Sequence, residues 1–348
     1  MKGLKDILGI KYDLGQAPML GVATPEMVAA IANQGGLGTL PLGGLPPAVC
    51  DKLLTKTKEL TDKPFAINIF LHPIIKENKE DIASMQTTLK TICKDNNIPY
   101  EEIPHFIQPT YHPILEVVLK HNIKIITFTF GCFTKEEIEL LHKQHIFLIG
   151  TATTVEEAKY LQDHKIDAIV LQGIEAGGHR GSFLSDNIED NLPLNQLFDC
   201  VRKEGVNIPL IVTGGLFTGK QAKDYFNRGA SFATFGSLFI TATESNAMEY
   251  QKDLLSKGTA VETKFTKAFS GKWARGIIND FMTQVDNSKS PIPDFPFQNI
   301  LTQNIRFFAK QKNLYNFNSL WCGINAHHAT RKDTKDIFNK LITEFYEQ

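Results

Sequence analysis

The chain alternates short, almost continuously apolar runs with segments that have the pattern of amphipathic helices. The clearest runs are residues 124–130, 146–149, 166–171, 209–212 and 231–235. Runs that are apolar on both faces are typical of buried parallel strands. Between them, Thr134, Thr154 and Thr218 each precede a Glu or Gln three positions later, a capping-box pattern that predicts where helices begin. The middle of the chain is therefore predicted to consist of repeated βα units.

Three earlier apolar runs, at residues 16–19, 37–40 and 65–70, bring the number of expected strands to eight. Repeated βα units form either a doubly wound sheet or a closed barrel, and periodicity alone does not separate the two. A count of eight, with glycines or polar residues at the strand ends, favours an α/β fold of the (β/α)8 TIM-barrel type.

Longer segments interrupt this alternation at residues 72–109, 180–195 and 243–311. We expect residues 1–242 and 312–348 to form the barrel. The helical pattern of residues 243–311 predicts a smaller, mostly helical appended domain that covers the active site.

Composition excludes several classes of function. Lys plus Arg (37) and Asp plus Glu (38) nearly cancel, so no bulk attraction to nucleic acid or to acidic lipid is expected. The five cysteines form no CxxC pair, which favours neither a disulfide framework nor a zinc site. No apolar run approaches membrane-spanning length. We expect a cytoplasmic protein without a metal site and without membrane or nucleic-acid partners.

Two consecutive strand ends carry glycines suited to binding a phosphate. Gly214 and Gly215 end one strand, and Phe235, Gly236 and Ser237 end the next. Glycine lets backbone N–H groups approach phosphate oxygens closely, and phosphates in barrels commonly bind after strands seven and eight. The alternative is that both are tight βα turns without a ligand. Because two glycine-bearing strand ends occur one βα unit apart, a phosphate site is favoured.

The most specific run extends from Gln172 through Gly177 and Gly178 to His179 and Arg180. It begins where a predicted strand ends, so Gln172 should lie at the barrel mouth. Two glycines permit a turn that would place His179 above the barrel, where an imidazole can accept a proton or hold a positive charge beside an anion. The alternative is a histidine that only binds nearby backbone. Arg180 and Glu175 are each expected to form a local ion pair or to brace the loop, and not to be catalytic.

At these residues the sequence resembles the nitronate monooxygenase family, also called the 2-nitropropane dioxygenase family, of class I. The resemblance covers nearly the whole chain: QAPMLGVATPEMVAAIANQGGLG, FAINIF, GTATTVEEAKYLQDHKIDAIVLQGIEAGGHRG, VTGGLF, ATFGSLF and LWCG. It implies one bound FMN and oxidation of alkyl nitronates, such as propionate 3-nitronate, by O2 to a carbonyl product and nitrite, a detoxification reaction. The resemblance is also compatible with a homodimer.

The resemblance further implies roles for individual residues. His179 matches the family's active-site histidine. The cofactor-binding positions are Ala17, Pro18, Met19, Asn68, Gln172, Gly177, Gly178, Gly214, Gly215, Phe235, Gly236 and Ser237. Leu20 and Asn325 depart from the family's usual motifs, which puts the substrate range in doubt.

Two other functions compete. Flavin-dependent enoyl-acyl-carrier-protein reductases share the EAGGH run and use NAD(P)H, but the GHRG continuation and the late LWCG favour the nitronate enzymes. A flavin-binding module without turnover would keep the glycine turns and would not need His179 behind two glycines.

Overall fold

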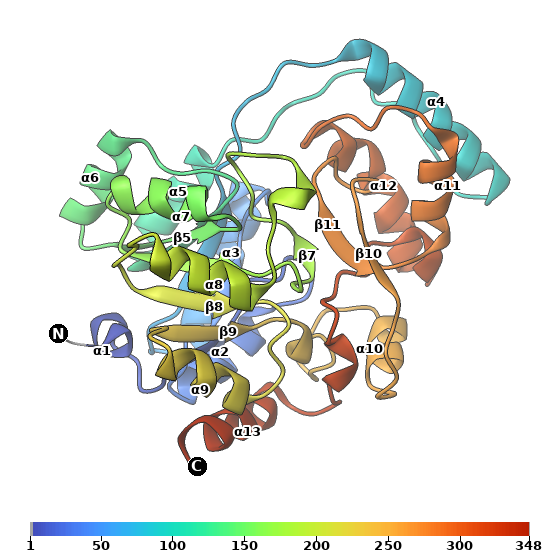
Figure 1. The fold of residues 1–348 in the computed structure, drawn as a ribbon. Helices are drawn as coiled ribbons and strands as arrows, with labels where there is room; N and C mark the ends of the chain where they lie inside the picture. The colour runs from blue at the N-terminus through green and yellow to red at the C-terminus, as the bar shows by residue number, and fades with distance from the viewer. Residues whose placement is uncertain (1–2, 348) are drawn as a thin grey trace.

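The computed structural model describes residues 3–347 and contains a nearly closed eight-stranded parallel barrel (Figure 1). Its strands are β1 (Leu14–Gln16), β2 (Thr39–Pro41), β3 (Ala66–Phe70), β4 (Ile125–Thr129), β5 (Phe147–Ala152), β6 (Ala168–Gln172), β8 (Leu210–Thr213) and β9 (Phe232–Phe235). They pair in the order β1-β9-β8-β6-β5-β4-β3-β2. A parallel bridge between Gly15 and Leu37 joins the two edges. The predicted TIM-type fold is confirmed.

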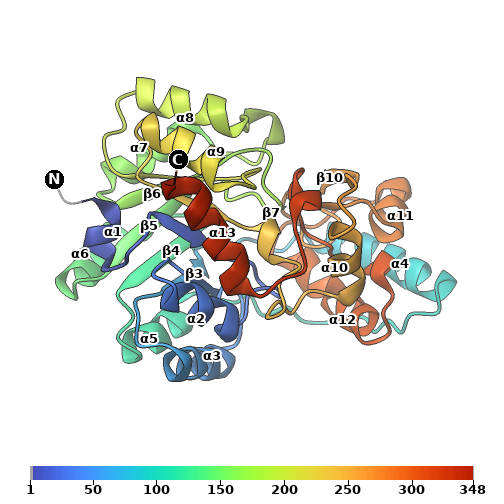
Figure 2. The same ribbon diagram turned by 90° about the horizontal axis from the view of Figure 1, so that it is seen from below.

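Helices surround the barrel and close its lower end. They are α2 (Pro25–Asn33), α3 (Pro47–Leu60), α5 (His112–Lys120), α6 (Lys135–Lys143), α7 (Val155–Asp163), α8 (Leu194–Lys203), α9 (Gly219–Asn227) and α13 (Thr334–Tyr346). Helix α1 (Leu4–Leu8) buries Leu4 and Leu8 against residues at the amino-terminal ends of the strands. Helix α13 packs on α2 and α9, as Figure 2 shows from below. The last helix thus returns to the barrel, as expected.

The capping residues act as predicted at two helices and differently at a third. Thr134 and Thr218 form full capping boxes with Glu137 and Gln221. Thr154 accepts the backbone N–H of Glu157, but the Glu157 carboxylate does not reach back to Thr154. It accepts the backbone N–H groups of residues 153, 183 and 184 instead. This buried carboxylate therefore holds the loop that follows His179.

The first strand was predicted at residues 16–19, which is wrong by about two residues. In the structure β1 ends at Gln16, and Ala17 donates one further hydrogen bond to the carbonyl of Phe235 at 2.9 Å. Pro18 has no N–H with which to continue the ladder. The Ala17–Met19 segment therefore turns over the barrel mouth.

A second apolar core lies beside the barrel. It combines α4 (Lys79–Asp95), α11 (Asp280–Ser288) and α12 (Phe297–Gln311), which lie together at the right of Figure 1. The shorter helices are α10 (Glu249–Leu255), η1 (Ile188–Asp190), η2 (Ser237–Phe239), η3 (Tyr315–Phe317) and η4 (Ala326–His328). The chain therefore leaves the barrel after β3, contributes α4 to the second core, and returns.

The segment expected to be mostly helical also contains a hairpin. Its strands β10 (Thr263–Thr266) and β11 (Ala274–Ile277) pair antiparallel, and β11 pairs with β7 (Gly178–His179). This three-stranded sheet is the direct connection between the barrel's glycine-rich loop and the second core.

None of the helices among residues 3–347 is both long and apolar enough to cross a membrane. The same residues contain no group of three or more His, Cys, Asp or Glu side chains arranged to hold a metal. All five cysteines are free thiols.

Candidate active site

The carboxyl ends of the barrel strands bring the first predicted segments together. A Cβ atom added to Gly236 would lie 3.7 Å from the sulfur of Met19 and 3.9 Å from the Cβ of Ala17. One added to Gly214 would lie 3.1 Å from the carbonyl oxygen of Gly173. The strand ends of β1, β6, β8 and β9 thus meet at one rim of the barrel, where working residues of this fold lie.

Each of the two positions before His179 requires glycine for a different structural reason. A Cβ on Gly177 would lie 2.2 Å from the backbone carbon of Cys322, so only glycine fits. Gly178 has a φ of +71°, and nothing lies within 4 Å of its added Cβ. One glycine therefore permits close packing on the late LWCG segment, and the other faces open space.

His179 is held by the hairpin as well as by its own loop. It pairs with Ala274 of β11, and its Nε2 lies 2.9 Å from the hydroxyl oxygen of Ser270. Its ring meets the rings of Phe130 and Trp321 edge-on, at centroid distances of 5.9 and 5.5 Å. The imidazole is thus fixed among aromatic side chains at the barrel mouth.

Burial is the main cause that lowers the pKa of His179, to about 3, and the positive charges of Lys272 and Arg306 lower it further. The imidazole is therefore neutral at physiological pH. A neutral imidazole keeps one lone pair that can accept a proton.

The hydrogen bonds of Ser270 indicate which ring nitrogen carries that lone pair. The Ser270 hydroxyl donates to the carbonyl of Lys272 at 3.1 Å, so its oxygen is left to accept from His179. His179 then carries its proton on Nε2. Its Nδ1 has no hydrogen-bond partner among residues 3–347 and is the basic atom of the site.

The remaining polar side chains of this loop act as braces. The Gln172 amide donates to the carbonyl of His179 at 3.0 Å and accepts from the N–H of Gly181 at 2.9 Å. Arg180 is fully buried and donates to the carbonyls of Gln172 and Gly173 and to the side chain of Asn191. The expectation that Arg180 braces the loop is confirmed. Glu175 has a similar bracing role, because its carboxylate accepts a hydrogen bond from the N–H of Leu194.

Asn68 is buried in the middle of β3 and has protein partners. Its amide nitrogen donates to the hydroxyls of Thr127 and Thr129 at 2.8 and 3.2 Å. Its carbonyl oxygen has only a long contact, 3.5 Å, with the Thr129 hydroxyl. That oxygen keeps capacity for a further donor.

The late LWCG segment closes over the two glycine turns. Gly323 donates its N–H to the Ser237 hydroxyl at 2.9 Å, and Asn325 donates its amide to the carbonyl of Gly215 at 2.8 Å. Asn325, which departs from the usual motif, thus holds a turn in place. The open space beside Gly178 has room for a planar group, and the turn at Gly236, where an added Cβ would meet nothing closer than 3.7 Å, has room for a phosphate tail.

Several residues that surround His179 were assigned no role from the sequence. Ser270, Lys272, Phe295 and Trp321 all come from the hairpin or from segments after it. A signal was available: residues 263–266 and 274–277 flank a Ser-Gly-Lys run, which is typical of a hairpin turn.

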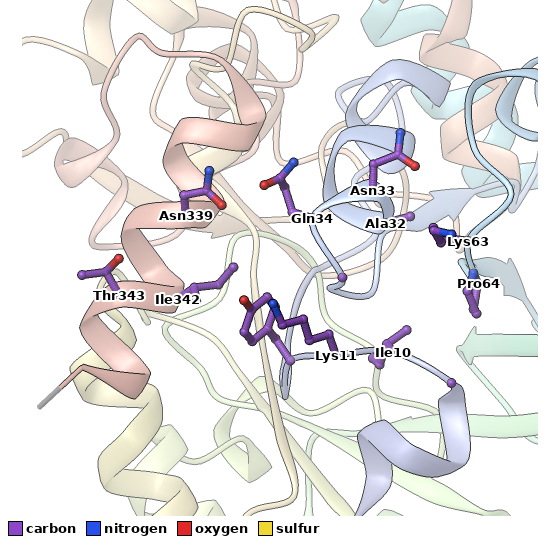
Figure 3. A pocket seen from close by; sticks show the side chains of 13 residues that line it. Ile10, Lys11, Ala32, Asn33, Gln34, Lys63, Pro64, Asn339, Ile342 and Thr343 are labelled. Atoms are coloured by element: carbon purple, nitrogen blue, oxygen red, sulfur yellow. The ribbon is translucent and has the colours of Figure 1, made fainter.

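A shallow hollow lies elsewhere, at the opposite end of the barrel (Figure 3). It has a volume of about 570 Å³ and is lined by residues 9–12 and 32–35, by Lys63 and Pro64, and by α13. These residues precede strands β1 to β3 or belong to the last helix. In this fold the amino-terminal end of the barrel serves stability, so the hollow is not the catalytic site.

The barrel carries a histidine above its mouth, and comparison with known proteins places it among the α/β-barrel oxidoreductases. The family model for nitronate monooxygenase matches residues 2–344, and the chain belongs to that family. A probable nitronate monooxygenase of Staphylococcus aureus strain JH9 is 34% identical, over 98% of this chain and 96% of its own. That of Staphylococcus saprophyticus is 34% identical over 91% of this chain and 90% of its own.

Solved structures support the same placement. Nitroalkane oxidase from Streptomyces ansochromogenes superposes with a TM-score of 0.90 at 28% identity, covering 99% of this chain and 98% of that protein. FabK from Thermotoga maritima gives a TM-score of 0.76 at 22% identity, covering 100% of this chain and 97% of that protein, a likeness of fold alone.

Proposed function

We propose that this protein is an FMN-dependent nitronate monooxygenase, which oxidises alkyl nitronates such as propionate 3-nitronate with O2 to a carbonyl compound and nitrite. The observation that carries the proposal is the neutral His179 beside the open space at Gly178, with an Nδ1 that has no hydrogen-bond partner in the described part of the chain. Family membership and the likeness to a nitroalkane oxidase support it.

The proposed cofactor site consists of the residues that match the cofactor-binding positions of the family. They are Ala17, Pro18, Met19, Asn68, Gln172, Gly177, Gly178, Gly214, Gly215, Phe235, Gly236 and Ser237. FMN, when bound, would accept electrons from the substrate and pass them to oxygen. The turns at Gly214–Gly215 and Gly236–Ser237 would hold its phosphate, and the free oxygen capacity of Asn68 would accept from the flavin ring.

His179 has two tasks in this proposal. For a neutral nitroalkane, Nδ1 accepts the proton from the carbon next to the nitro group. For a nitronate, which has already lost that proton, the imidazole and the positive charge of Arg306 stabilise the bound anion. Ser270 keeps the proton on Nε2 throughout.

We further propose that residues 243–311 cover the site, since the hairpin within them supplies Ser270 and Lys272. The barrel would then comprise residues 1–242 and 312–348, with α4 added to the covering unit because it shares the second core. A cytoplasmic location and a homodimer complete the proposal.

The test is anaerobic stopped-flow spectroscopy of the purified holoenzyme. Propionate 3-nitronate should bleach the flavin absorbance rapidly, and NADH or NADPH should act slowly or not at all. Rapid reduction by a nicotinamide with no response to nitronate would instead identify an NAD(P)H-dependent reductase of the enoyl-acyl-carrier-protein type. Denaturation should release FMN, and release of FAD would refute the cofactor assignment.

A further inference from the structure

The turn between β10 and β11 places a lysine beside His179. Gly271 has a φ of +79°, and an added Cβ would lie 2.2 Å from the carbonyl oxygen of Pro293, so this turn is packed tightly against the 293–295 segment. The Ser270 hydroxyl bonds both the N–H and the carbonyl of Lys272, at 3.3 and 3.1 Å. The hydroxyl that contacts His179 therefore also fixes the backbone of Lys272.

The side chain of Lys272 lies over an aromatic ring that it shares with His179. Its Nζ is 5.0 Å from the centroid of Phe130, and the His179 ring centroid is 5.9 Å from the same point. Phe130 has a φ of +73°, which is uncommon for a bulky residue and points to a functional constraint. Lysine and histidine thus both lie against the same ring, whose backbone conformation is fixed.

Lys272 differs from Lys264 and Lys267 of the same hairpin in its ion-pair partners. Lys264 forms an ion pair with Asp286, and Lys267 with Asp186. Within residues 3–347, no carboxylate lies close enough to form an ion pair with Lys272. Lys272 is half-buried, and this burial lowers its pKa, while the more distant carboxylates of Asp186, Glu157 and Asp294 act on it in the opposite direction. A half-buried ammonium group without a direct ion-pair partner is unfavourable, and an anion bound beside it offsets that penalty.

We propose that Lys272 determines specificity for nitronates that carry a second negative group, a carboxylate, at the other end of a short carbon chain. This inference rests on the proposed function. The reacting carbon lies at Nδ1 of His179, and the distal carboxylate lies at Nζ of Lys272, beyond the Phe130 ring. Substrates without a distal charge make no use of Lys272.

The experiment compares propionate 3-nitronate with ethyl nitronate, which lacks the carboxylate, as substrates of the holoenzyme. Lys272→Met should lower the ratio of their kcat/KM values about tenfold to a hundredfold, chiefly by raising KM for propionate 3-nitronate, as loss of a charged hydrogen bond implies. Lys272→Arg should restore most of the ratio. The matched control is Lys267→Met, which removes an ion-paired lysine of the same hairpin and should keep the wild-type ratio.

A second readout does not depend on turnover. Succinate, a non-reacting dicarboxylate, should bind the wild-type holoenzyme in calorimetry and bind Lys272→Met at least tenfold more weakly. Equal losses on both nitronates, together with unaltered succinate binding, would overturn the role of Lys272. A wild-type enzyme that turns over neither nitronate would overturn the proposed function, and the succinate result would still decide whether Lys272 binds carboxylates.

Discussion

The Nε2 atom of His179 lies 2.9 Å from the hydroxyl oxygen of Ser270, across 91 residues of sequence. The contact joins the barrel's glycine-rich loop to the β10–β11 hairpin. It fixes the ring's orientation and keeps its proton on Nε2, so that Nδ1 is the atom available for chemistry.

Replacing Ser270 with alanine should therefore impair His179 without removing it. We expect Ser270→Ala to lower kcat on neutral nitroalkanes about fivefold to tenfold, the effect of one lost hydrogen bond. The pH profile of kcat/KM should shift as well, because the imidazole loses its fixed tautomer. Ser270→Thr, which keeps the hydroxyl, is the control. An unchanged profile in the alanine variant would mean that the contact is only structural.

His179→Asn should retain the cofactor and lose about a hundredfold or more in activity on neutral nitroalkanes, where a proton must leave carbon. Activity on preformed nitronates should fall less, because that proton has already gone. Steady-state rates on nitroethane and on ethyl nitronate measure the difference. Equally severe losses on both would assign His179 to anion binding, and no loss on either would remove it from the mechanism.

The depressed pKa of His179 also predicts how stability depends on pH. The unfolded chain binds a proton near the ordinary pKa of 6.5, and the folded protein does so only near 3. The stabilising contribution of the neutral imidazole is therefore fully present above about pH 6.5 and is lost as the pH falls toward 3. The slope is at most about 1.4 kcal/mol per pH unit.

Urea unfolding at pH 7 and pH 5 measures this effect. The wild-type protein should lose about 2 kcal/mol more than His179→Asn between these two values, since the variant lacks the titrating group. Other ionisable groups contribute equally to both proteins. Parallel pH dependences would show that His179 titrates normally in the folded state.

Gly236 offers the cleanest test of the phosphate turn. Its φ is −106°, and an added Cβ would meet nothing closer than 3.7 Å, so a side chain fits without strain in the protein itself. Gly215 is less suitable, because its φ is +72° and its Cβ would lie 2.8 Å from that of Glu175. Gly236→Asp should weaken FMN binding at least about tenfold relative to the isosteric Gly236→Asn, through like-charge repulsion. Fluorescence titration of the apoprotein gives both dissociation constants, and equal values would place the phosphate elsewhere.

The sequence predicted the barrel well because its strands are buried on both faces. Runs such as residues 166–171 contain almost no polar residue, and few other structures accommodate such a run. The glycine-rich loop was equally informative, since Gly177 and Gly178 permit contacts and angles that other residues do not. Local sequence carries both kinds of information.

The surroundings of His179 could not be predicted in the same way. Ser270 and Lys272 reach the site only because β11 pairs with the two-residue strand β7. A strand so short has no periodicity, and its pairing is set by tertiary packing. For the same reason, the partner of Glu157 could not be inferred: its carboxylate serves a loop that lies 26 residues away instead of its own helix cap.

The detour of α4 into the second core has a consequence for protein synthesis. Helix α4 ends at Asp95, and α11, against which it packs, begins only at Asp280. At a ribosomal rate of about 5–20 residues per second, roughly ten seconds or more separate the appearance of the two helices. Through that interval the apolar side of α4, including Met85 and Leu89, lacks the side chains of α11 and α12 that cover it in the folded protein, and only neighbours such as Ile98 have been made. This helix is where a chaperone that acts at the ribosome would bind, and where translation pausing would most increase aggregation.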